Sequence, residues 1–463
     1  MSTTKKIVIL GGGESGIGAA LLAKSKGFEV FVSDKNPLSP KYEQVLTDEN
    51  ILYEEGEHTE DIILSAAEII KSPGIPSNAD IVLKAKKAKI PIISEIEFAA
   101  RYTKAKIIAI TGSNGKTTTT LLTYHLLKSA GLKVGLGGNV GESWAKQLVK
   151  DEYDYWVLEV SSFQLDDCYE FAPDVAIILN ITPDHLDRYE NNFQNYVDAK
   201  FKIIQNIKKE QVFIYQKDNP AIAQEMKKRV IGGQHFPISL SEVLDNGAYL
   251  KGQFLDFYDK KQKTSFSIQT NEIHLKGKHN MVNVMASIQV CLRMSVPETA
   301  LKEYFQSFYG VEHRLEEVET IEGVRFINDS KATNVDSVYY ALDSFEDQVI
   351  WIAGGIDKGN DYTKIKDLVI KKVKALVCLG KNNTKLVDFF RDCVHIIYQT
   401  EDIRDATEQA FELSKKGEVV LLSPACASFD LFANYEERGK EFKKSVQKIH
   451  KISAMKAKEN KEK

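Results

Sequence analysis

The sequence lacks the features of a secreted, membrane-spanning or nucleic-acid-binding protein. Its 463 residues include five cysteines, an odd number with no CxxC pair, which argues against a disulfide framework and against a zinc knuckle. No apolar run approaches the ~20 residues of a membrane span, and the N-terminus has no signal-peptide pattern. A net charge of −4 provides no basic field for a nucleic acid. We therefore expect a cytoplasmic protein with no membrane span and no nucleic-acid partner.

The composition is that of a folded protein with more than one domain. Hydrophobic residues make up 43% of the chain and charged residues 27%, as in soluble globular proteins. The chain is too long for one ordinary core, and its length predicts about three domains.

A glycine loop between a strand and a helix is the strongest motif. The β-branched run Ile107–Ile110 ends at Thr111-Gly-Ser-Asn-Gly-Lys-Thr117, and a segment with helical periodicity follows. Gly112 and Gly115 would let backbone N–H groups approach a phosphate, Lys116 would reach the outer phosphates, and Thr117 could ligate magnesium. Only two residues separate these glycines, whereas the general Walker A pattern has four, so the loop is a shortened variant. The alternative is a Gly-Lys-Thr turn that binds nothing.

A second glycine turn lies near the N-terminus. The strand Lys6–Leu10 leads into Gly11-Gly-Gly-Glu-Ser-Gly16 and a helix, and Asp34 follows Gly16 by eighteen residues. This spacing fits a dinucleotide-binding fingerprint, with a pyrophosphate at the helix start near Ser15 and with Asp34 or Lys35 at the sugar or base. The alternative is a βαβ unit without a ligand.

Polar residues follow several strands of the predicted second domain. Asn139 follows the strand Lys133–Gly138, Glu159 ends a buried strand, and His185 lies in the loop after Val175–Ile181. The carboxyl ends of strands line the ligand crevice in a doubly wound sheet, so Glu159 could hold magnesium beside the phosphates. His185 is either a ligand or a lone surface histidine. Lys200 is the odd member of an apolar helix face within residues 193–207, where a snorkelling lysine is the alternative.

The remaining chain predicts small antiparallel strands, another helix and a third α/β domain. Residues 247–276 alternate apolar and polar side chains, and Asn280 and Asn283 share a helix face that could contact a purine edge. Three later strands end in polar loops, as expected of a second α/β crevice; they lie near residues 328–334, 353–359 and 423–430. The Lys-rich tail predicts a frayed helix or disorder.

Together these motifs resemble those of the Mur ligases, the ATP-dependent amino-acid ligases of peptidoglycan precursor synthesis, over nearly the whole chain. In order, they are TGSNGKTT, the strand ending at Glu159, DHLDRY, Lys200, GKHNMVN, EHR, NDSKATN and SPACASFDLF followed by YEERG. The resemblance implies an α/β fold of three domains. These are a Rossmann-like UDP-binding domain (1–95), a central P-loop ATPase domain (96–309) and a Rossmann-like domain (310–445) that contacts the amino acid and ATP, followed by the Lys-rich tail (446–463).

The resemblance also implies an activity. The last two motifs favour members that add D-glutamate to UDP-N-acetylmuramoyl-L-alanine, through an acyl phosphate that D-glutamate attacks to give an amide, ADP and phosphate. The cofactors would be ATP and two Mg²⁺ ions, which Mn²⁺ could replace, and the enzyme would act as a monomer. Its product would serve cell wall growth, cell shape and cell division.

Site roles follow from the same resemblance, position by position. Lys116, Glu159, His185, Lys200, Arg314 and Lys331 would be catalytic, and the metal ligands would be Thr117, Glu159, His185 and a carbamylated Lys200. ATP would contact Gly112, Ser113, Asn114, Gly115, Lys116, Thr117, Thr118, Asn280, Asn283, Arg314, Asp329 and Lys331. The UDP-sugar would contact Ser15, Gly16, Asp34, Lys35, Ser72, Gly74 and Asn139. D-Glutamate would contact His185, Thr333, Lys358, Ser428, Phe429 and Tyr435, the last standing where phenylalanine is usual.

Three other functions compete with this hypothesis. A sister ligase would add L-alanine to the nucleotide sugar or glutamate to a folate. A nicotinamide-dependent oxidoreductase would use GGGESG but leaves the second glycine loop unexplained. A nucleotide switch without catalysis would not need Glu159, His185 and Lys200 at one sheet edge.

Overall fold

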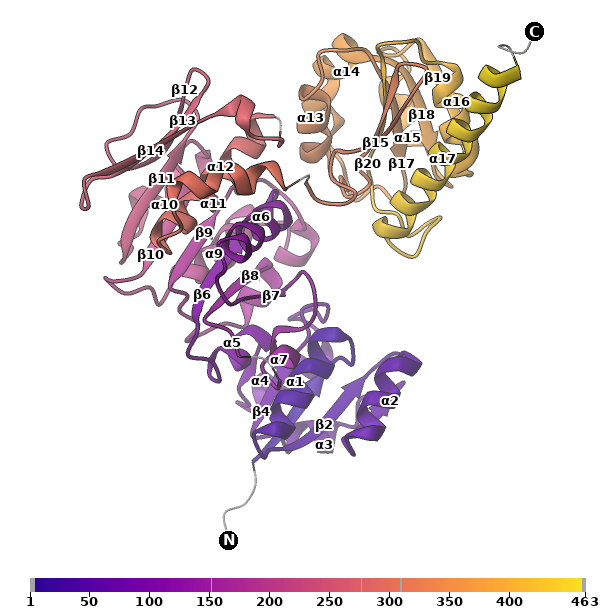
Figure 1. Ribbon diagram of the computed structural model, residues 1–463. Coiled ribbons are helices and arrows are strands. Elements are labelled where there is room, and N and C mark those ends of the chain that lie inside the picture. Colours follow the sequence, from indigo (N-terminus) through magenta and orange to yellow (C-terminus); the bar gives the residue numbers. More distant parts are fainter. Residues whose placement is uncertain (1–4, 151, 276, 309, 460–463) are drawn as a thin grey trace. The chain divides into compact units, whose positions relative to one another are not determined.

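The computed structural model describes residues 5–150, 152–275, 277–308 and 310–459, which form three β-sheets with helices packed against them (Figure 1). The chain falls into two compact units, which are described separately. The first holds Met1–His274 and Asn280–Phe308, and the second holds Leu275–His279 and Tyr309–Lys463. In the described part of the chain, each helix is too short or too polar to cross a bilayer.

The first sheet is parallel, with strand order β3-β2-β1-β4-β5. Its central strand β1 carries the continuous apolar run Ile7–Leu10, which is buried on both faces as expected in a parallel sheet covered by helices. The strands are β1 Lys6–Leu10, β2 Glu29–Asp34, β3 Leu52–Glu55, β4 Glu68–Lys71 and β5 Ile92–Ile93. The helices are α1 Glu14–Ser25, α2 Pro40–Asp48, α3 Glu60–Leu64, α4 Asp80–Lys87 and α5 Glu95–Ala100.

The second sheet has nine strands in the order β14-β13-β12-β11-β10-β9-β6-β8-β7. From β7 to β12 neighbouring strands are parallel, and β12, β13 and β14 form the expected antiparallel ladder. The strands are β6 Lys106–Thr111, β7 Val134–Gly138, β8 Tyr155–Glu159, β9 Val175–Ile178, β10 Val212–Gln216, β11 Gln234–Ser239, β12 Gly247–Lys251, β13 Phe254–Asp259 and β14 Thr264–Gln269. The helices are α6 Lys116–Ser129, α7 Trp144–Gln147, α8 Ser162–Asp166, α9 Phe193–Phe201, α10 Pro220–Lys228, α11 Lys278–Arg293 and α12 Glu298–Gln306.

The third sheet has the order β15-β16-β20-β17-β18-β19, with only the β15–β16 pair antiparallel. Its two faces carry separate apolar cores, one of them beneath α16 and α17. The strands are β15 Glu316–Ile321, β16 Val324–Asn328, β17 Val349–Gly354, β18 Val373–Leu379, β19 Ile396–Thr400 and β20 Val419–Ala425. The helices are α13 Val335–Asp343, α14 Lys366–Lys372, α15 Thr384–Phe390, α16 Ile403–Glu412 and α17 Tyr435–Glu459.

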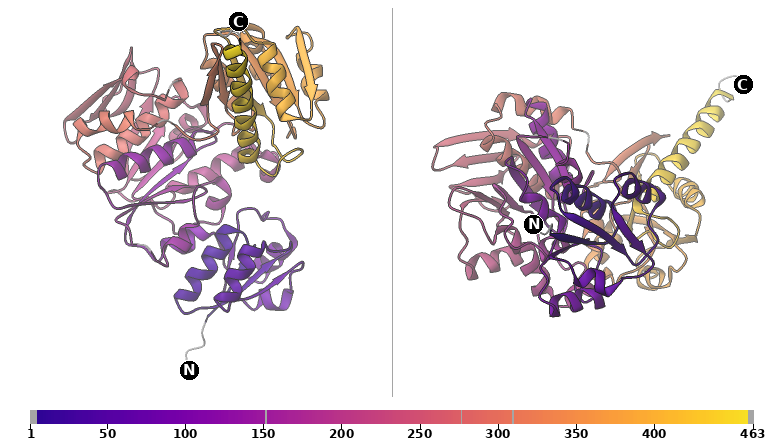
Figure 2. Two further views of the ribbon diagram at one scale, coloured as in Figure 1. Left: turned by 45° about the vertical axis from the view of Figure 1, so that its right-hand side comes forward. Right: turned by 90° about the horizontal axis from the view of Figure 1, so that it is seen from below.

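The C-terminal tail differs from the expectation of a frayed helix or disorder. Residues up to Glu459 continue α17, which packs on α16 and β15 (Figure 2). Val446 and Ile449 are buried in the core beneath it, so two apolar anchors hold this part of the helix. The last four residues lie outside the described chain.

Candidate active site

The phosphate-loop motif forms the connection between β6 and α6. Gly115 is the N-cap of α6 and has φ +82°, in the left-handed region that favours glycine. An added Cβ there would come within 2.4 Å of Asn283 Oδ1, so this loop and α11 are in close contact. Asn180, just after β9, holds the loop by accepting from Asn114 N at 2.8 Å and donating to Asn114 O at 3.0 Å. The loop conformation is thus fixed from two neighbouring elements.

Two lysines converge on one carbonyl of this loop. Lys116 Nζ donates to Gly112 O at 2.8 Å and to Ser113 O at 3.0 Å, and Lys200 Nζ donates to Gly112 O at 2.9 Å. Lys200 is only 1% exposed. Burial, reinforced by the charge of Lys116, holds the pKa of Lys200 well below its usual value. Lys200 is therefore a buried amine that faces the loop, and it does not snorkel to solvent.

Tyr196 lies beside the same amine on α9. Its ring centroid is 4.6 Å from Lys200 Nζ, and its hydroxyl lies 3.1 Å from Ser113 Oγ. Ser113 Oγ also donates to Thr182 O at 2.9 Å. Tyr196 fits the periodic apolar face of the helix, but its hydroxyl belongs to the site.

Glu159 lies at the carboxyl end of β8, as the strand pattern predicts. Its side chain is buried, and Oε1 accepts from Asn139 Nδ2 at 2.9 Å. Its other oxygen, Oε2, is buried without a hydrogen-bond partner. A buried carboxylate oxygen of this kind is suited to a hard cation such as Mg²⁺.

A cavity of about 340 Å³ joins several of the predicted residues within the first unit. Gly74, Lys116, Asn139, His185 and Lys200 all line it. The side chain of His185 is 41% exposed and its ring lies edge-on to Phe163 at 5.2 Å. His185 has φ +52°, and the left-handed backbone turns the chain directly before the 3₁₀ helix Leu186–Tyr189. The cavity therefore has phosphate-loop, strand-end and N-terminal-loop residues in its wall.

The N-terminal sheet contributes two loops to the first unit. Asp34 accepts from Gly12 N at 2.7 Å and so closes over the glycine turn. Ser72 Oγ donates to Gly11 O at 3.2 Å, and Lys35 is exposed. Arg188 reaches the second loop through bonds to Pro73 O at 3.2 Å and Gly74 O at 3.4 Å.

Three further predicted sets lie at helix starts. Ser15 and Gly16 are in the first turn of α1, where a Cβ on Gly16 would come within 1.8 Å of Gly11 O. Asn280 and Asn283 are buried in the first turns of α11, with Asn283 Nδ2 donating to Asn280 Oδ1 at 3.1 Å. Thr117 and Thr118 lie in the first turn of α6.

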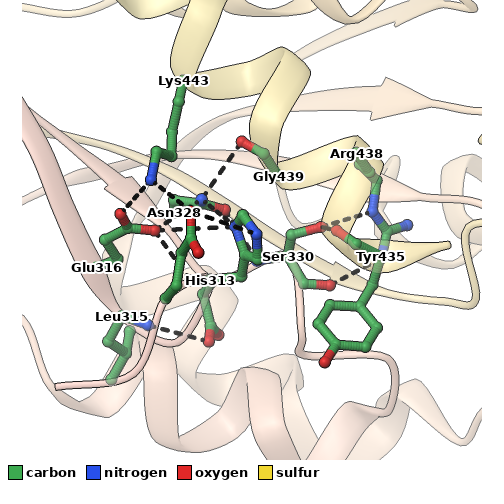
Figure 3. A network of polar contacts seen from close by, with 11 residues as sticks. His313, Leu315, Glu316, Asn328, Ser330, Tyr435, Arg438, Gly439 and Lys443 are labelled. Atoms are coloured by element: carbon green, nitrogen blue, oxygen red, sulfur yellow. Dashed lines mark hydrogen bonds and ion pairs between the residues drawn. The ribbon is translucent and has the colours of Figure 1, made fainter. Parts of the chain in front are cut away.

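The second unit holds a polar network around the start of α17 (Figure 3). Asn328 Nδ2 donates to His313 Nδ1 at 2.8 Å and to Glu316 Oε2 at 3.1 Å. Arg438, which is 2% exposed, donates to Ser330 O at 2.9 Å. The network ties the EHR segment and the NDSKATN segment to one helix.

This network positions three residues that the resemblance to the Mur ligases assigns to the nucleotide. Lys331 N donates to His313 O at 3.1 Å, and Lys331 Nζ lies 5.2 Å from the Tyr435 ring centroid. Asp329 accepts from Ser423 Oγ at 2.9 Å, and Arg314 Nη1 is 3.8 Å from Asp329 Oδ1. Burial raises the pKa of Asp329 to about 6, although Arg314 opposes the shift.

The residues expected at D-glutamate follow neighbouring strands of the third sheet. Thr333 comes after β16, Lys358 after β17, and Ser428 and Phe429 after β20. These strands are parallel neighbours, so their carboxyl ends meet at one edge. Ser428 is buried, Lys358 is exposed and Phe429 is 66% exposed. Joint action of these residues with the phosphate loop of the first unit remains a prediction.

Four contact residues escaped the sequence reasoning. Asn180 could have been found as the polar residue that ends an apolar strand, and Arg188 as the charged residue of DHLDRY. Arg438 could have been found in the same way, as the arginine of YEERG. No local signal marks the hydroxyl of Tyr196, because its contact with Ser113 depends on segments that are distant in sequence.

Comparisons with known families cover most of the chain. Residues 5–94 match the model described as Mur ligase MurD-like, N-terminal domain. Residues 110–291 match the Mur ligase middle domain, and residues 313–426 match the Mur ligase, glutamate ligase domain.

Curated relatives and solved structures agree with these matches. UDP-N-acetylmuramoylalanine--D-glutamate ligase of Bacteroides thetaiotaomicron is 50% identical over 96% of this chain and 100% of its own length, and that of Christiangramia forsetii is 47% identical over the same shares. The crystal structure of UDP-N-acetylmuramate-alanine ligase from Thermotoga maritima has a TM-score of 0.61 at 18% identity, covering 96% of this chain and 99% of that one. The MurF ligase of Thermotoga maritima in complex with ADP has a TM-score of 0.60 at 17% identity, covering 92% and 99%. With three family domains in order and relatives near 50% identity over almost its whole length, the chain belongs to the Mur ligase family.

Proposed function

We propose that this chain is an ATP-dependent ligase that joins D-glutamate to UDP-N-acetylmuramoyl-L-alanine in peptidoglycan precursor synthesis. Relatives that share about half of its residues carry that activity in their names. The observation that carries the proposal is the 340 Å³ cavity, whose wall contains the phosphate-loop Lys116, the buried Lys200 and His185. A nicotinamide enzyme would not require that set.

The reaction proposed has two steps. An oxygen of the substrate carboxylate attacks the γ-phosphorus of ATP, and ADP leaves with the electrons of the broken bond. The amine of D-glutamate then attacks the acyl carbon, loses a proton, and expels phosphate as the amide forms. Catalysis of such steps depends mainly on positioning and on compensation of phosphate charge.

The residues of the first unit fit these requirements. Lys116 now donates to the loop carbonyls of Gly112 and Ser113, and a phosphate in the loop would offer it stronger, charged acceptors. Asn139 and His185 line the same cavity and are proposed to contact the muramoyl-alanine substrate. Ser15, Gly16, Asp34, Lys35, Ser72 and Gly74 are proposed to hold the UDP group.

Two Mg²⁺ ions are proposed at this site, with Mn²⁺ as a substitute. The partnerless buried oxygen of Glu159 fits a cation, together with Thr117 at the helix start. A carbamylated Lys200 and His185 are proposed as ligands of the second ion. When bound, the ions would neutralise charge on the transferred phosphoryl group. The buried position of Lys200 favours the neutral amine that can add carbon dioxide.

The second unit is proposed to bind D-glutamate and part of the nucleotide. Lys358 and Ser428 would meet the carboxylates, with Thr333, Phe429 and Tyr435 nearby. Arg314, Asp329 and Lys331 would contact ATP, while Asn280 and Asn283, which belong to the first unit, would lie near adenine. A cytoplasmic monomer is proposed.

The test is ADP formation with UDP-N-acetylmuramoyl-L-alanine and a panel of D- and L-amino acids. We expect turnover with D-glutamate and little with L-glutamate or L-alanine. Turnover driven by L-alanine with the unsubstituted muramate, or by a folate with glutamate, would instead identify a sister ligase. Binding of NAD without any ADP formation would contradict the proposal.

A further inference from the structure

A second cavity, of about 240 Å³, lies in the first unit between the antiparallel ladder and the end of α11. Its wall comes from β13, β14, the last turns of α11 and the loop into α12. None of the residues assigned above to the active site lines it. Asn283 and Arg293 are ten residues apart on α11, which is about 15 Å of helix. This cavity is therefore separate from the catalytic one.

Gln289 gives this cavity an unsatisfied polar group. The residue lines the cavity and is 2% exposed. Both its side-chain nitrogen and its side-chain oxygen are buried without a hydrogen-bond partner. Burial of an amide without partners is unfavourable, because the bonds it made to water in the unfolded chain are lost. A ligand that both donates and accepts would satisfy it.

Arg293 supplies a buried positive charge in the same wall. Its side chain is 13% exposed, and its guanidinium carbon lies 3.2 Å from the centroid of the Phe236 ring. Nη1 donates to Gln289 O at 2.9 Å, and Nη2 reaches Asp259 Oδ2 only at 3.5 Å. A guanidinium has five N–H donors, so these two contacts leave donors on its edge for a carboxylate. Burial lowers the pKa of Arg293 to about 10, which leaves the group charged at neutral pH.

Asp259 provides the opposite charge. Its Oδ1 accepts from Lys261 N at 3.0 Å and from Gln262 N at 2.9 Å. Its Oδ2 has the long contact to Arg293, which leaves acceptor capacity for an ammonium group. The cavity wall thus holds one cation, Arg293, and a partly buried carboxylate, Asp259, beside the buried amide of Gln289. The exposed side chains of Gln262 and Glu298 add a second amide and a second carboxylate to the wall, and Phe257, Phe266 and Val296 add buried apolar surface.

We propose that this cavity binds a free α-amino acid with an apolar side chain. Its carboxylate would bind Arg293 and the Gln289 amide nitrogen, and its ammonium group would bind Asp259 and the Gln289 amide oxygen. The side chain would lie on the apolar wall. The volume is below the ~300–1,000 Å³ of pockets for drug-sized ligands, which fits a small metabolite. The site is distinct from the one proposed for D-glutamate, because D-glutamate has an acidic side chain and the ligand proposed here has an apolar one.

The experiment is a thermal-shift titration of the full chain without nucleotide, using the L and D forms of alanine, valine, leucine and phenylalanine. At least one should raise the melting temperature in a saturable way. Its deaminated counterpart, such as 4-methylpentanoate for leucine, should not, because it lacks the ammonium group.

Variants test the assigned contacts. Gln289→Leu should fold with an unchanged or higher melting temperature, since no internal bond is lost, but should bind the amino acid about tenfold or more weakly. Asp259→Asn should also weaken binding. Lys116→Ala, in the catalytic cavity, should leave this affinity unchanged.

Four results would overturn the proposal. They are no saturable shift with any of these amino acids, equal binding of the deaminated acid, full affinity in Gln289→Leu, and loss of binding in Lys116→Ala. The last would assign the effect to the catalytic cavity.

Discussion

Lys200 Nζ donates a hydrogen bond to Gly112 O at 2.9 Å, joining α9 to the phosphate-binding loop from inside the first unit. The lysine is 1% exposed. Its described hydrogen bond goes to a backbone carbonyl and not to a carboxylate. An ordinary lysine has a pKa of about 10.4 and would repel a metal ion. The burial of Lys200 beside a phosphate loop therefore raises the question of how a lysine could take part in a metal site.

The first prediction is that Lys200→Ala is nearly inactive and is partly rescued by acetate or formate. These anions can enter the vacated space and replace the oxygens of a carbamate, whereas chloride at equal ionic strength cannot. The measurement is ADP formation against carboxylate concentration. Lys202→Ala is the matched control, because Lys202 Nζ donates to Asp166 O and not to the loop. Absence of rescue, with no carbamate mass on Lys200, would return this residue to a structural role.

The second prediction is that Lys116→Ala abolishes turnover with little change in unfolding free energy. Loss of one charged donor at a developing negative charge costs about 3 kcal/mol or more, a hundredfold or greater in kcat. The control is Lys128→Ala at the exposed end of the same helix. Near-normal ADP production by Lys116→Ala would remove the loop from the mechanism.

The third prediction concerns pH and Glu95, at the start of α5. Glu95 is fully buried and accepts from Ser143 Oγ and from Ala145 N at 3.0 Å. Burial raises its pKa from 4.5 to about 7 despite these bonds. The folded state then binds the proton more tightly than the unfolded state, so this group lowers stability as pH rises from about 4.5 to about 7.

Glu95→Gln should remove that dependence. Its unfolding free energy, relative to the parent chain, should increase across this pH range by on the order of 3 kcal/mol and stay constant above it. Urea denaturation at several pH values measures the difference. A difference that does not change with pH would contradict the raised pKa.

The fourth prediction is that Gly439→Ala destabilises the second unit. A Cβ at Gly439 would lie 2.3 Å from His313 Nδ1, within the network of Figure 3. Glycine to alanine inside a helix is ordinarily stabilising, but here overpacking should cost about 1–3 kcal/mol. Thermal or urea denaturation measures the loss. The loss should shrink in a His313→Ala background, and an equal loss in both backgrounds would show that the ring is not the cause.

The fifth prediction is closure of the chain on its ligands. Arg314 and Lys331 lie in the second unit yet are assigned to the nucleotide, so the linker near Gly310 should act as a hinge. Small-angle scattering should show compaction when an ATP analogue and UDP-N-acetylmuramoyl-L-alanine are added together. An unchanged radius of gyration would count against closure.

The sequence alone predicted what depends on neighbours along the chain. The strand Lys6–Leu10, the glycine loop before α6 and the strand end at Glu159 all follow from local apolar runs and turn residues. The α/β class and the antiparallel ladder followed from the same local patterns. The order of the motifs gave the family, which the domain matches confirm.

Only the tertiary structure decided what depends on contacts between distant segments. The apolar pattern of a helix face does not predict whether Lys200 reaches solvent or the carbonyl of Gly112, because the burial of its side chain depends on the sheet beneath the helix. The Lys-rich tail is helical to Glu459 because the core beneath it holds Val446 and Ile449. Likewise, Gln289 and Asp259 share a cavity only because α11 packs beside the antiparallel ladder, which lies about thirty residues earlier in the chain. The spacing of residues in the sequence does not predict that contact.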